Sequence, residues 1–341
     1  MRPASEVDMI DGVSDLEGND AVAELEATAA LVGDVQAEIS KFIFGQRMVI
    51  DLALTTLLAG GHALLVGVPG LAKTRLVETL GAVLGLDEKR IQFTPDLMPS
   101  DILGSEVLEQ SRTGERAFRF IKGPVFSQLL MADEINRASP RTQSALLQSM
   151  QEKQVSIAGT RHDLPRPFHV LATQNPLEQE GTYPLPEAQL DRFLMQIDVD
   201  YPDEAAEREM LISTTGPVEG RARTILSPEK LMHAQAVVRR IPSGTQVVDA
   251  ILEIVRSARP TEDASDDVKR HVAWGPGPRA SQALLLASRA RALLEGRLAP
   301  SVDDVIALVP PILRHRMALT FTARADGLTI DGVIGDLLRK L

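Results

Sequence analysis

The feature that most restricts the fold is a short apolar run that passes directly into a glycine-rich loop and then into a helix-like segment. The run HALLV is followed by Gly67-Val68-Pro69-Gly70-Leu71-Ala72-Lys73-Thr74 and then by RLVETLGAVL. Glycines let backbone N–H groups curl around an anion, and the start of a helix adds positive potential. We therefore expect a loop for nucleotide phosphates, in which Lys73 reaches the β- and γ-phosphates and Thr74 binds magnesium.

One position departs from the usual GxxxxGK[ST] pattern of such loops. Ala72 stands where glycine is commoner. Alanine suits this place on the condition that the backbone is already helical there, since alanine is the best helix former. The competing explanation for the whole segment is an ordinary strand, turn and helix that contain a lysine by chance.

Two neighbouring acids end a second apolar run, QLLMADE, about sixty residues further on. Asp133 is predicted to hold magnesium, usually through water, and Glu134 to orient and deprotonate the attacking water. Alternatively, these acids only favour the start of the following helix, where Ser139 and Pro140 suit the N-cap and first position. Beside a phosphate loop the first interpretation is favoured, because ATP hydrolysis needs a metal-holding acid and a water-activating group on the neighbouring strand.

Three further polar residues are candidates for the same site. Asn175 ends the apolar run HVLATQN, where it either contacts the γ-phosphate and attacking water or begins a turn before the next proline. Arg192 precedes the last expected strand, and Arg279 lies at the start of a helix. A cation there is disfavoured by the helix dipole by roughly 0.3 to 1 kcal/mol, which suggests an anion nearby, such as phosphate. The alternative is a surface arginine paired with an acid, Asp191 or Glu187 in the case of Arg192.

From residue 62 onward, short apolar runs alternate with amphipathic segments of helix length, which is typical of a sheet covered on both faces by helices. The expected strands are HALLVGV, RIQFT, SQLLMADE, FHVLATQN and LMQIDVDYP. Two hairpins are predicted, one in SEVLEQSRTGERAFRFIKG with its turn around Thr113 and Gly114, the other in QVSIAGTRHDL with its turn near Gly159. After about residue 201 the strand signal fades, and helices are expected in LMHAQAVVRRI, VVDAILEIVRSA, RASQALLLASRARALLE and SVDDVIALVPPILRHRM.

Composition and charge narrow the function further. The sequence has no cysteine, which excludes disulfides, zinc–cysteine sites, iron–sulfur clusters and thiol nucleophiles. Residues 1–38 hold ten acids and one base, so they carry −9 of the net charge of −11. This acidic arm is expected to run into a first helix within residues 21–44. No long uncharged apolar run or secretion signal is seen, so we expect a cytoplasmic protein without membrane insertion.

The ordered series GVPGLAKT, LLMADEINRA, LATQNP, LPEAQLDRF and GPRAS resembles the MoxR family of AAA+ ATPases, relatives of the magnesium-chelatase I subunit. The resemblance runs from about residue 42 to the end of the chain. It implies a P-loop α/β fold with a five-stranded parallel sheet flanked by helices, and a smaller C-terminal all-α lid. We expect an acidic arm with the start of the first helix at 1–38, an AAA+ domain at 39–215 and a lid at 216–341.

The resemblance also implies roles for single residues. By position, Asn175 becomes sensor 1, Arg279 sensor 2, and Arg192 the finger that reaches the neighbouring subunit's nucleotide. Phe44 and Gly45 lie in the segment Ile43–Gln46 that matches the part packed near adenine, and the hairpins match the helix-2 insert and the pre-sensor-1 hairpin. ATP and Mg²⁺ are the implied cofactors, and a hexameric ring the implied assembly. Family members act like chaperones on partner proteins, often ones carrying a von Willebrand factor A domain.

Two other functions remain open at this stage. A nucleic-acid motor shares these motifs, but it should carry lysine and arginine on its hairpins or in an added basic module. The expected hairpins offer only Arg112, Arg116 and Arg119 in one and Arg161 with His162 in the other, so nucleic acid is not the expected partner. The third possibility is the motor subunit of a metal chelatase.

Overall fold

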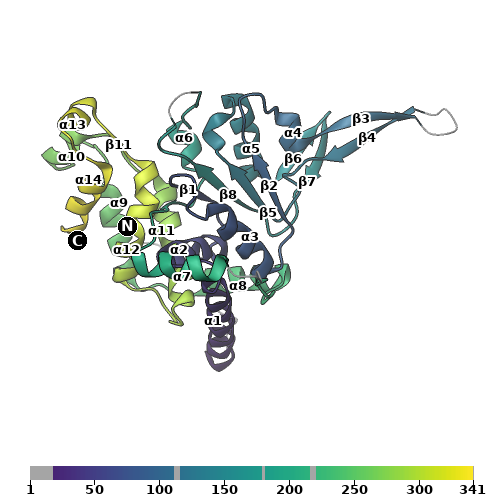
Figure 1. Cartoon of the computed structure of the whole chain (residues 1–341). Helices are drawn as coiled ribbons and strands as arrows, with labels where there is room; N and C mark the ends of the chain where they lie inside the picture. Colours follow the sequence, from purple (N-terminus) through teal and green to yellow (C-terminus); the bar gives the residue numbers. More distant parts are fainter. Residues whose placement is uncertain (1–17, 111–115, 179–180, 216–219, 341) are drawn as a thin grey trace, which may run out of the picture.

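A five-stranded parallel sheet forms the centre of the computed structural model, which describes residues 18–110, 116–178, 181–215 and 220–340 (Figure 1). The strand order is β2-β5-β8-β1-β9. The sheet with five parallel strands is confirmed: four strands fall within the runs predicted from the sequence, and β2 begins two residues before its predicted run. Their bounds are β1 (Ala63–Val66), β2 (Glu88–Gln92), β5 (Leu129–Asp133), β8 (His169–Gln174) and β9 (Met195–Asp198).

Both faces of the sheet are buried along its inner strands, which explains why β1 and β5 are almost continuously apolar, whereas the edge strand β2 is largely polar and partly exposed. Successive side chains of a strand point to opposite faces. Leu65 and Met131 join one core cluster, whereas Leu64 and Leu130 join the other. The first cluster lies against helices near the chain start and the lid, and the second against the helix after β5 (Figure 1). The helices on the two faces are α2 (Arg47–Leu58), α3 (Lys73–Leu84) and α5 (Pro140–Glu152).

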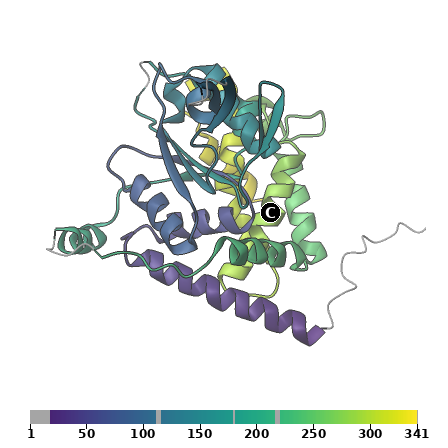
Figure 2. The same ribbon diagram turned by 90° about the vertical axis from the view of Figure 1, so that its right-hand side faces the viewer.

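The first helix, α1 (Gly18–Ser40), begins three residues before the helix expected within residues 21–44. Figure 2 shows it lying along the body of the molecule. Val32 and Val35 of α1 are buried in the first core cluster. Glu38 is also buried, and its carboxylate accepts hydrogen bonds from the Arg223 N–H (3.0 Å) and guanidinium (3.2 Å). The second half of residues 1–38 is therefore part of the packed structure.

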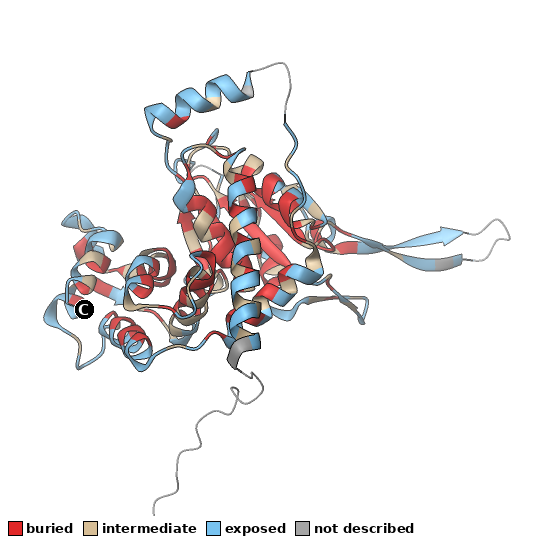
Figure 3. Cartoon of the chain, turned by 90° about the horizontal axis from the view of Figure 1, so that it is seen from below, coloured by how far each residue is buried: buried red, intermediate tan, exposed pale blue. Residues whose placement is uncertain are grey.

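Two antiparallel hairpins project from the α/β part, as the sequence predicts. The longer one pairs β3 (Gly104–Gln110) with β4 (Arg116–Lys122), and its outer part is exposed on both strands (Figure 3). The turn predicted around Thr113 and Gly114 lies outside the described residues. The shorter one pairs β6 (Gln154–Ile157) with β7 (Thr160–Asp163), and Gly159 occupies its turn with a φ of 84°.

The C-terminal part is mainly helical and shares the first core cluster with α1 and α2. It also contains a short antiparallel pair of strands, β10 and β11, which the sequence analysis did not predict because two or three residues are too few to show an alternating pattern. Within the described ranges, none of the helices is both long and apolar enough to cross a bilayer. The elements not yet named are α4 (Pro99–Leu103), η1 (Ile135–Arg137), α6 (Glu187–Leu190), α7 (Glu204–Thr214), α8 (Pro228–Arg240), α9 (Thr245–Ser257), α10 (Asp266–His271), β10 (Val272–Trp274), α11 (Pro278–Leu294), α12 (Val302–Leu313), η2 (Arg314–Arg316), β11 (Ala318–Leu319), α13 (Phe321–Ala325) and α14 (Ile330–Leu338).

Candidate nucleotide site

The glycine-rich loop leaves the carboxyl end of β1 and turns into α3. Gly67 passes so close to β9 that a Cβ on it would lie 2.5 Å from the Val199 carbonyl oxygen, so a side chain cannot be placed there. Gly70 has a φ of 88°, a conformation that L-residues rarely adopt. These two glycines let the backbone curl back over the end of the sheet, as the sequence predicts for a phosphate-binding loop.

The backbone at Ala72 is not helical, so the condition under which alanine suits this place is not met. Ala72 has a φ of 56° and a ψ of 19°, which is left-handed, and α3 begins only at Lys73. The loop needs this reversal to bring its N–H groups to one side before the helix begins. An L-residue in this conformation costs roughly 1–2 kcal/mol, which explains why glycine is commoner at this position.

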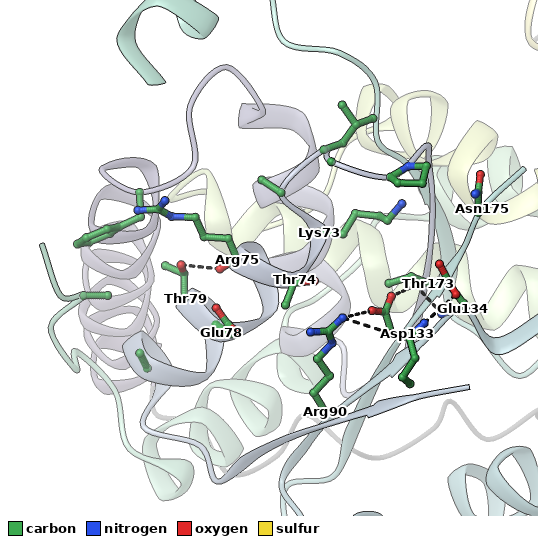
Figure 4. Close-up of a pocket in the computed structure, with 18 of the residues that line it drawn as sticks. Lys73, Thr74, Arg75, Glu78, Thr79, Arg90, Asp133, Glu134, Thr173 and Asn175 are labelled. Carbon is green, nitrogen blue, oxygen red and sulfur yellow. Dashed lines mark hydrogen bonds and ion pairs between the residues drawn. The ribbon is translucent and has the colours of Figure 1, made fainter. Parts of the chain in front are cut away.

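Lys73 lies inside the loop rather than on the surface. Its Nζ donates hydrogen bonds to the carbonyl oxygens of Gly67 and Val68, the latter at 3.0 Å. Burial lowers the pKa of Lys73, and the negative charges of Asp133 and Glu134 act in the opposite direction. The lysine therefore faces the two acids across the cavity (Figure 4).

The two acids lie at the end of β5, directly beside the loop. The Asp133 carboxylate accepts a hydrogen bond from Arg90 on β2 at 2.5 Å and another from the Thr173 hydroxyl on β8 at 2.5 Å. The Glu134 carboxylate accepts hydrogen bonds from Gln92 at 2.7 Å and Arg137 at 2.8 Å. Both carboxylates are thus fixed by side chains from neighbouring elements.

Glu134 does not act as a helix cap. Its backbone is left-handed, with φ 54° and ψ 51°, and its side chain makes no capping hydrogen bond to η1. Such a conformation costs on the order of 1–3 kcal/mol and is found preferentially at functional sites. The following helix α5 has its own N-cap, Ser139, with Pro140 in the first turn, as predicted. Helix capping therefore does not explain the acid pair.

Asn175 makes a turn contact and also lies in the wall of the candidate site. Its Oδ1 accepts a hydrogen bond from the Leu177 N–H at 3.1 Å, which is a turn contact. The residue is also buried and lines the same cavity as Lys73 and Glu134. The turn contact holds the amide group at the rim of this cavity, where Figure 4 shows it beside Glu134.

A single cavity of about 920 Å³ brings most of the predicted residues together. It also contains side chains that the sequence analysis missed, among them Arg90, Thr173 and Phe42. Arg90 and Gln92 flank Ile91 on β2 and therefore point to the same face of this edge strand, and this alternation was the available signal. The lining residues are Phe42, Pro69, Gly70, Leu71, Ala72, Lys73, Thr74, Arg75, Glu78, Thr79, Ala82, Arg90, Gln92, Asp133, Glu134, Thr173, Asn175, Gly220, Arg221 and Ala222.

A second cavity, of about 370 Å³, adjoins the other side of the phosphate loop and contains Phe44. The Gln46 side chain lies in its wall and donates a hydrogen bond to the Leu71 carbonyl at 3.3 Å, which ties this segment to the loop. Gly45 has a φ of 68° and lies against Ala206 of α7 so closely that no Cβ fits there. Apolar atoms of Phe44 and Tyr201 thus face a space that opens onto the phosphate loop.

Arg192 and Arg279 are not part of the cavity at the phosphate loop. Both line a separate cavity of about 270 Å³. The anion near Arg279 is the Asp191 carboxylate, 3.5 Å from its guanidinium, so the phosphate that its helix position suggested is not supported within one chain. Asp191 also pairs with the buried Arg316 at 2.7 Å. Among the described residues, Arg192 has no ion pair with Asp191 or Glu187, and its buried Nε has no hydrogen-bond partner.

The strand register puts Arg192 at the end of the sheet opposite to the phosphate loop, and Arg279 lines the same cavity as Arg192. Ala63 at the start of β1 pairs with Met195, and Val66 at its end pairs with Asp198. Arg192 precedes Met195, whereas the loop follows Val66, so at least the length of a four-residue strand, roughly 13 Å, separates them. The arginine side chains cannot reach the phosphate loop of their own chain.

The phosphate loop follows β1 and the acid pair ends β5, and β8 lies between these two strands, which are therefore not side by side as expected. A phosphate loop and an acid pair at the same end of one parallel sheet, with a mainly helical lid, define a P-loop ATPase of the AAA+ class. Residues 62–195 match the model of the ATPase family associated with various cellular activities (AAA), and residues 264–336 match that of the AAA lid domain. The chain belongs to the MoxR family of these ATPases and is an ATP hydrolase.

Relatives of known sequence and structure support this assignment. The chain is 45% identical to Chaperone MoxR1 of Mycobacterium tuberculosis, over 89% of this chain and 80% of that protein. It is 32% identical to Protein MoxR of Paracoccus denitrificans, over 84% and 88% of the two chains. A crystal structure of a Cytophaga hutchinsonii protein, 38% identical, superposes with a TM-score of 0.87 over 94% of this chain and 97% of that one.

Proposed function

We propose that this ATPase assembles into a homo-hexameric ring and uses ATP hydrolysis to remodel or mature a partner protein. The observation that carries the ring is the position of Arg192, with Arg279 beside the same cavity, at the end of the sheet opposite to the phosphate loop. The two arginines share one cavity and are too far from the nucleotide site of their own chain. They are therefore available to contact the nucleotide bound to a neighbouring copy. A ring gives every nucleotide site such a neighbour.

Within one subunit, Lys73 and the loop N–H groups bind the phosphates of ATP. The Thr74 hydroxyl and the Asp133 carboxylate hold Mg²⁺, and no group of three or more His, Asp or Glu in the described part of the chain offers a richer set of ligands. This suits Mg²⁺, which keeps several waters and is held by few protein ligands together with phosphates. When bound, Mg²⁺ neutralises charge on the phosphate oxygens.

The hydrolytic step requires a base beside the γ-phosphate, and Glu134 fills this role in the proposal. Its carboxylate accepts the proton of the attacking water, and the Asn175 amide orients that water or the γ-phosphate. The contacts from Gln92 and Arg137 to the Glu134 carboxylate set its direction. The adenine ring occupies the cavity lined by Phe44, against the segment that contains Gly45.

The role of Glu134 is tested by Glu134→Gln, which keeps the shape of the side chain but cannot accept a proton. We expect near-normal ATP binding and loss of turnover, measured by nucleotide titration and phosphate release. Glu152→Gln on the exposed side of α5 is a matched control and should hydrolyse ATP normally. Near-normal turnover by Glu134→Gln would refute the assignment.

The action of Arg192 on a neighbouring subunit is tested by mixing two inactive variants. Arg192→Ala should bind ATP but hydrolyse it poorly, since such a finger is worth roughly 10³ to 10⁵ in rate. Mixed with Lys73→Ala subunits, it should regain activity at interfaces that combine an intact loop with an intact arginine. Arg279→Ala should behave in the same way if it also acts on the neighbour. No recovery in rings shown to be mixed would favour Arg137 or Arg141 as the residue facing the neighbour.

The proposed client is a protein, such as one with a von Willebrand factor A domain, and the proposed location is the cytoplasm. The curated name of the Mycobacterium tuberculosis relative includes the word chaperone, which supports a protein client. The long hairpin gives little support to a nucleic-acid motor, because Arg119 on it is already paired with Glu109 at 3.0 Å. Capture of partners by Glu134→Gln with ATP bound tests the client, and salt-dependent DNA binding tests the motor.

A further inference from the structure

Thr173 is the residue that joins the two acids of the site. Its side chain is 1% exposed on the central strand β8. The hydroxyl donates a hydrogen bond to the Asp133 carboxylate at 2.5 Å and accepts one from the Glu134 backbone N–H at 2.8 Å. One hydroxyl group therefore contacts the side chain of the first acid and the backbone of the second (Figure 4).

The contact to Glu134 matters because of the backbone conformation there. Glu134 is left-handed, with a φ of 54°, and an L-residue stays in this conformation only where its surroundings hold it. The Thr173 hydroxyl holds the N–H of Glu134, and the Arg137 N–H donates to its carbonyl at 2.9 Å. The direction of the Glu134 side chain depends on both contacts.

The two acids do not depend on Thr173 equally. Asp133 keeps a second partner, Arg90, at 2.5 Å on its other carboxylate oxygen. The Glu134 N–H has its described partner in the Thr173 hydroxyl, and the hydroxyl is buried away from water. Without it, the N–H would be a buried donor lacking an acceptor, and the backbone would be free to leave the left-handed conformation.

We propose that Thr173 is a positioning residue for hydrolysis, which fixes the left-handed turn at Glu134 and thereby aims its carboxylate at the attacking water. Thr173 also holds Asp133 in the register that presents its carboxylate to Mg²⁺. It does so from β8, and Asn175 directly follows the end of this strand, two residues after Thr173. The inference rests on the role proposed for Glu134.

The test compares variants that separate the hydroxyl group from the volume of the side chain. Thr173→Val keeps the volume and removes the hydroxyl, and Thr173→Ser keeps the hydroxyl. Thr56→Val is the matched control, because Thr56 is also buried but donates only to the Leu52 carbonyl of its own helix, at 2.8 Å. Turnover is measured by phosphate release and binding by titration with a fluorescent ATP analogue, after thermal melting has verified the fold.

We expect Thr173→Val to lower kcat about 10- to 100-fold, with nucleotide affinity changed by less than about threefold. Thr173→Ser should restore turnover to within about threefold of the native chain, and Thr56→Val should leave it unchanged. If Thr173→Val does not fold, Thr173→Ala takes its place in the comparison with Thr173→Ser. Normal turnover of the hydroxyl-free variant, or equal loss in Thr173→Ser, would overturn the proposal.

The double variant with Glu134→Gln distinguishes this inference from the function on which it rests. If Thr173 acts through Glu134, Thr173→Val should cause little further loss once Glu134→Gln has removed the base. A full additional loss would overturn the proposed route through Glu134. Normal hydrolysis by Glu134→Gln alone would instead refute the role of Glu134 as base, whatever the result for Thr173.

Discussion

Buried histidines should make the stability of this protein fall between pH 7 and pH 5. Among the described residues these are His62, His169 and His315, and burial lowers the pKa of each. His62 precedes β1 and His169 begins β8, and both are almost fully buried. The His62 Nδ1 accepts a hydrogen bond from the Val170 N–H at 2.9 Å, so this nitrogen cannot carry a proton. The His169 Nε2 lies 3.0 Å from the Gln235 Nε2, and its Nδ1 lies 2.8 Å from the Gly61 carbonyl, which fits a neutral ring that donates only through Nδ1.

Burial is the main cause that lowers the pKa of His62 from 6.5 to about 3 and that of His169 to about 4. His169 and Lys153 also lower the pKa of His62, and Lys153 lowers that of His169. A lowered pKa in the folded state means that stability is fully present above pH 6.5 and is lost as pH falls toward the folded values. Each histidine should contribute a slope of about 1.4 kcal/mol per pH unit, or about 2 kcal/mol from pH 7 to 5.

The assay is urea denaturation at several values between pH 7 and pH 5. The native chain should lose on the order of 4 kcal/mol of unfolding free energy from His62 and His169, in addition to the loss from His315. In His169→Gln the slope of the unfolding free energy against pH should be smaller by about one proton. Leu147→Ala is the control: it removes buried apolar contacts, so it should lower stability by about 2–5 kcal/mol equally at each pH. Glu38, whose pKa is lowered to about 2 mainly by Lys41, titrates below this window. A free energy of unfolding that is flat between pH 7 and 5 would refute the reasoning.

Three other predictions concern the loop and the arm. Lys73→Ala should weaken nucleotide binding about 10- to 100-fold by calorimetry, because it removes a charge-assisted contact; unchanged affinity would exclude Lys73 from the site. Ala72→Gly should keep or raise the melting temperature, because the backbone at this position is left-handed and glycine adopts that conformation without strain. A decrease of about 1 kcal/mol in the free energy of unfolding would instead indicate that residue 72 is helical. Deletion of residues 1–17 should leave ATP hydrolysis intact, and loss of hydrolysis in this variant would show that the arm is part of the motor. A chain that starts near residue 36 should instead be less stable, because it lacks Val32 and Val35 of the core.

The sequence by itself determined the features that depend on neighbouring residues in the chain. The phosphate loop, the acid pair and Asn175 each follow an apolar strand directly, and the carboxyl ends of parallel strands meet at one edge of a sheet. Local order was therefore enough to predict that Lys73, Asp133, Glu134 and Asn175 share one cavity. The five strands and both hairpins were equally accessible, because each carries its own pattern of apolar residues and turns.

The tertiary structure alone decided which side chains from separate strands touch. Thr173 reaches both acids only because β8 lies beside β5 in one particular register, which no local pattern fixes. Arg279 lies with Arg192, far from its own phosphate loop, because the lid packs at the other end of the sheet. The left-handed backbone at Ala72 likewise depends on how the loop must turn over the carboxyl end of the sheet, and composition favours a helix there. Such contacts are set by long-range packing, since the free energy that selects them comes from burying both faces of the sheet at once.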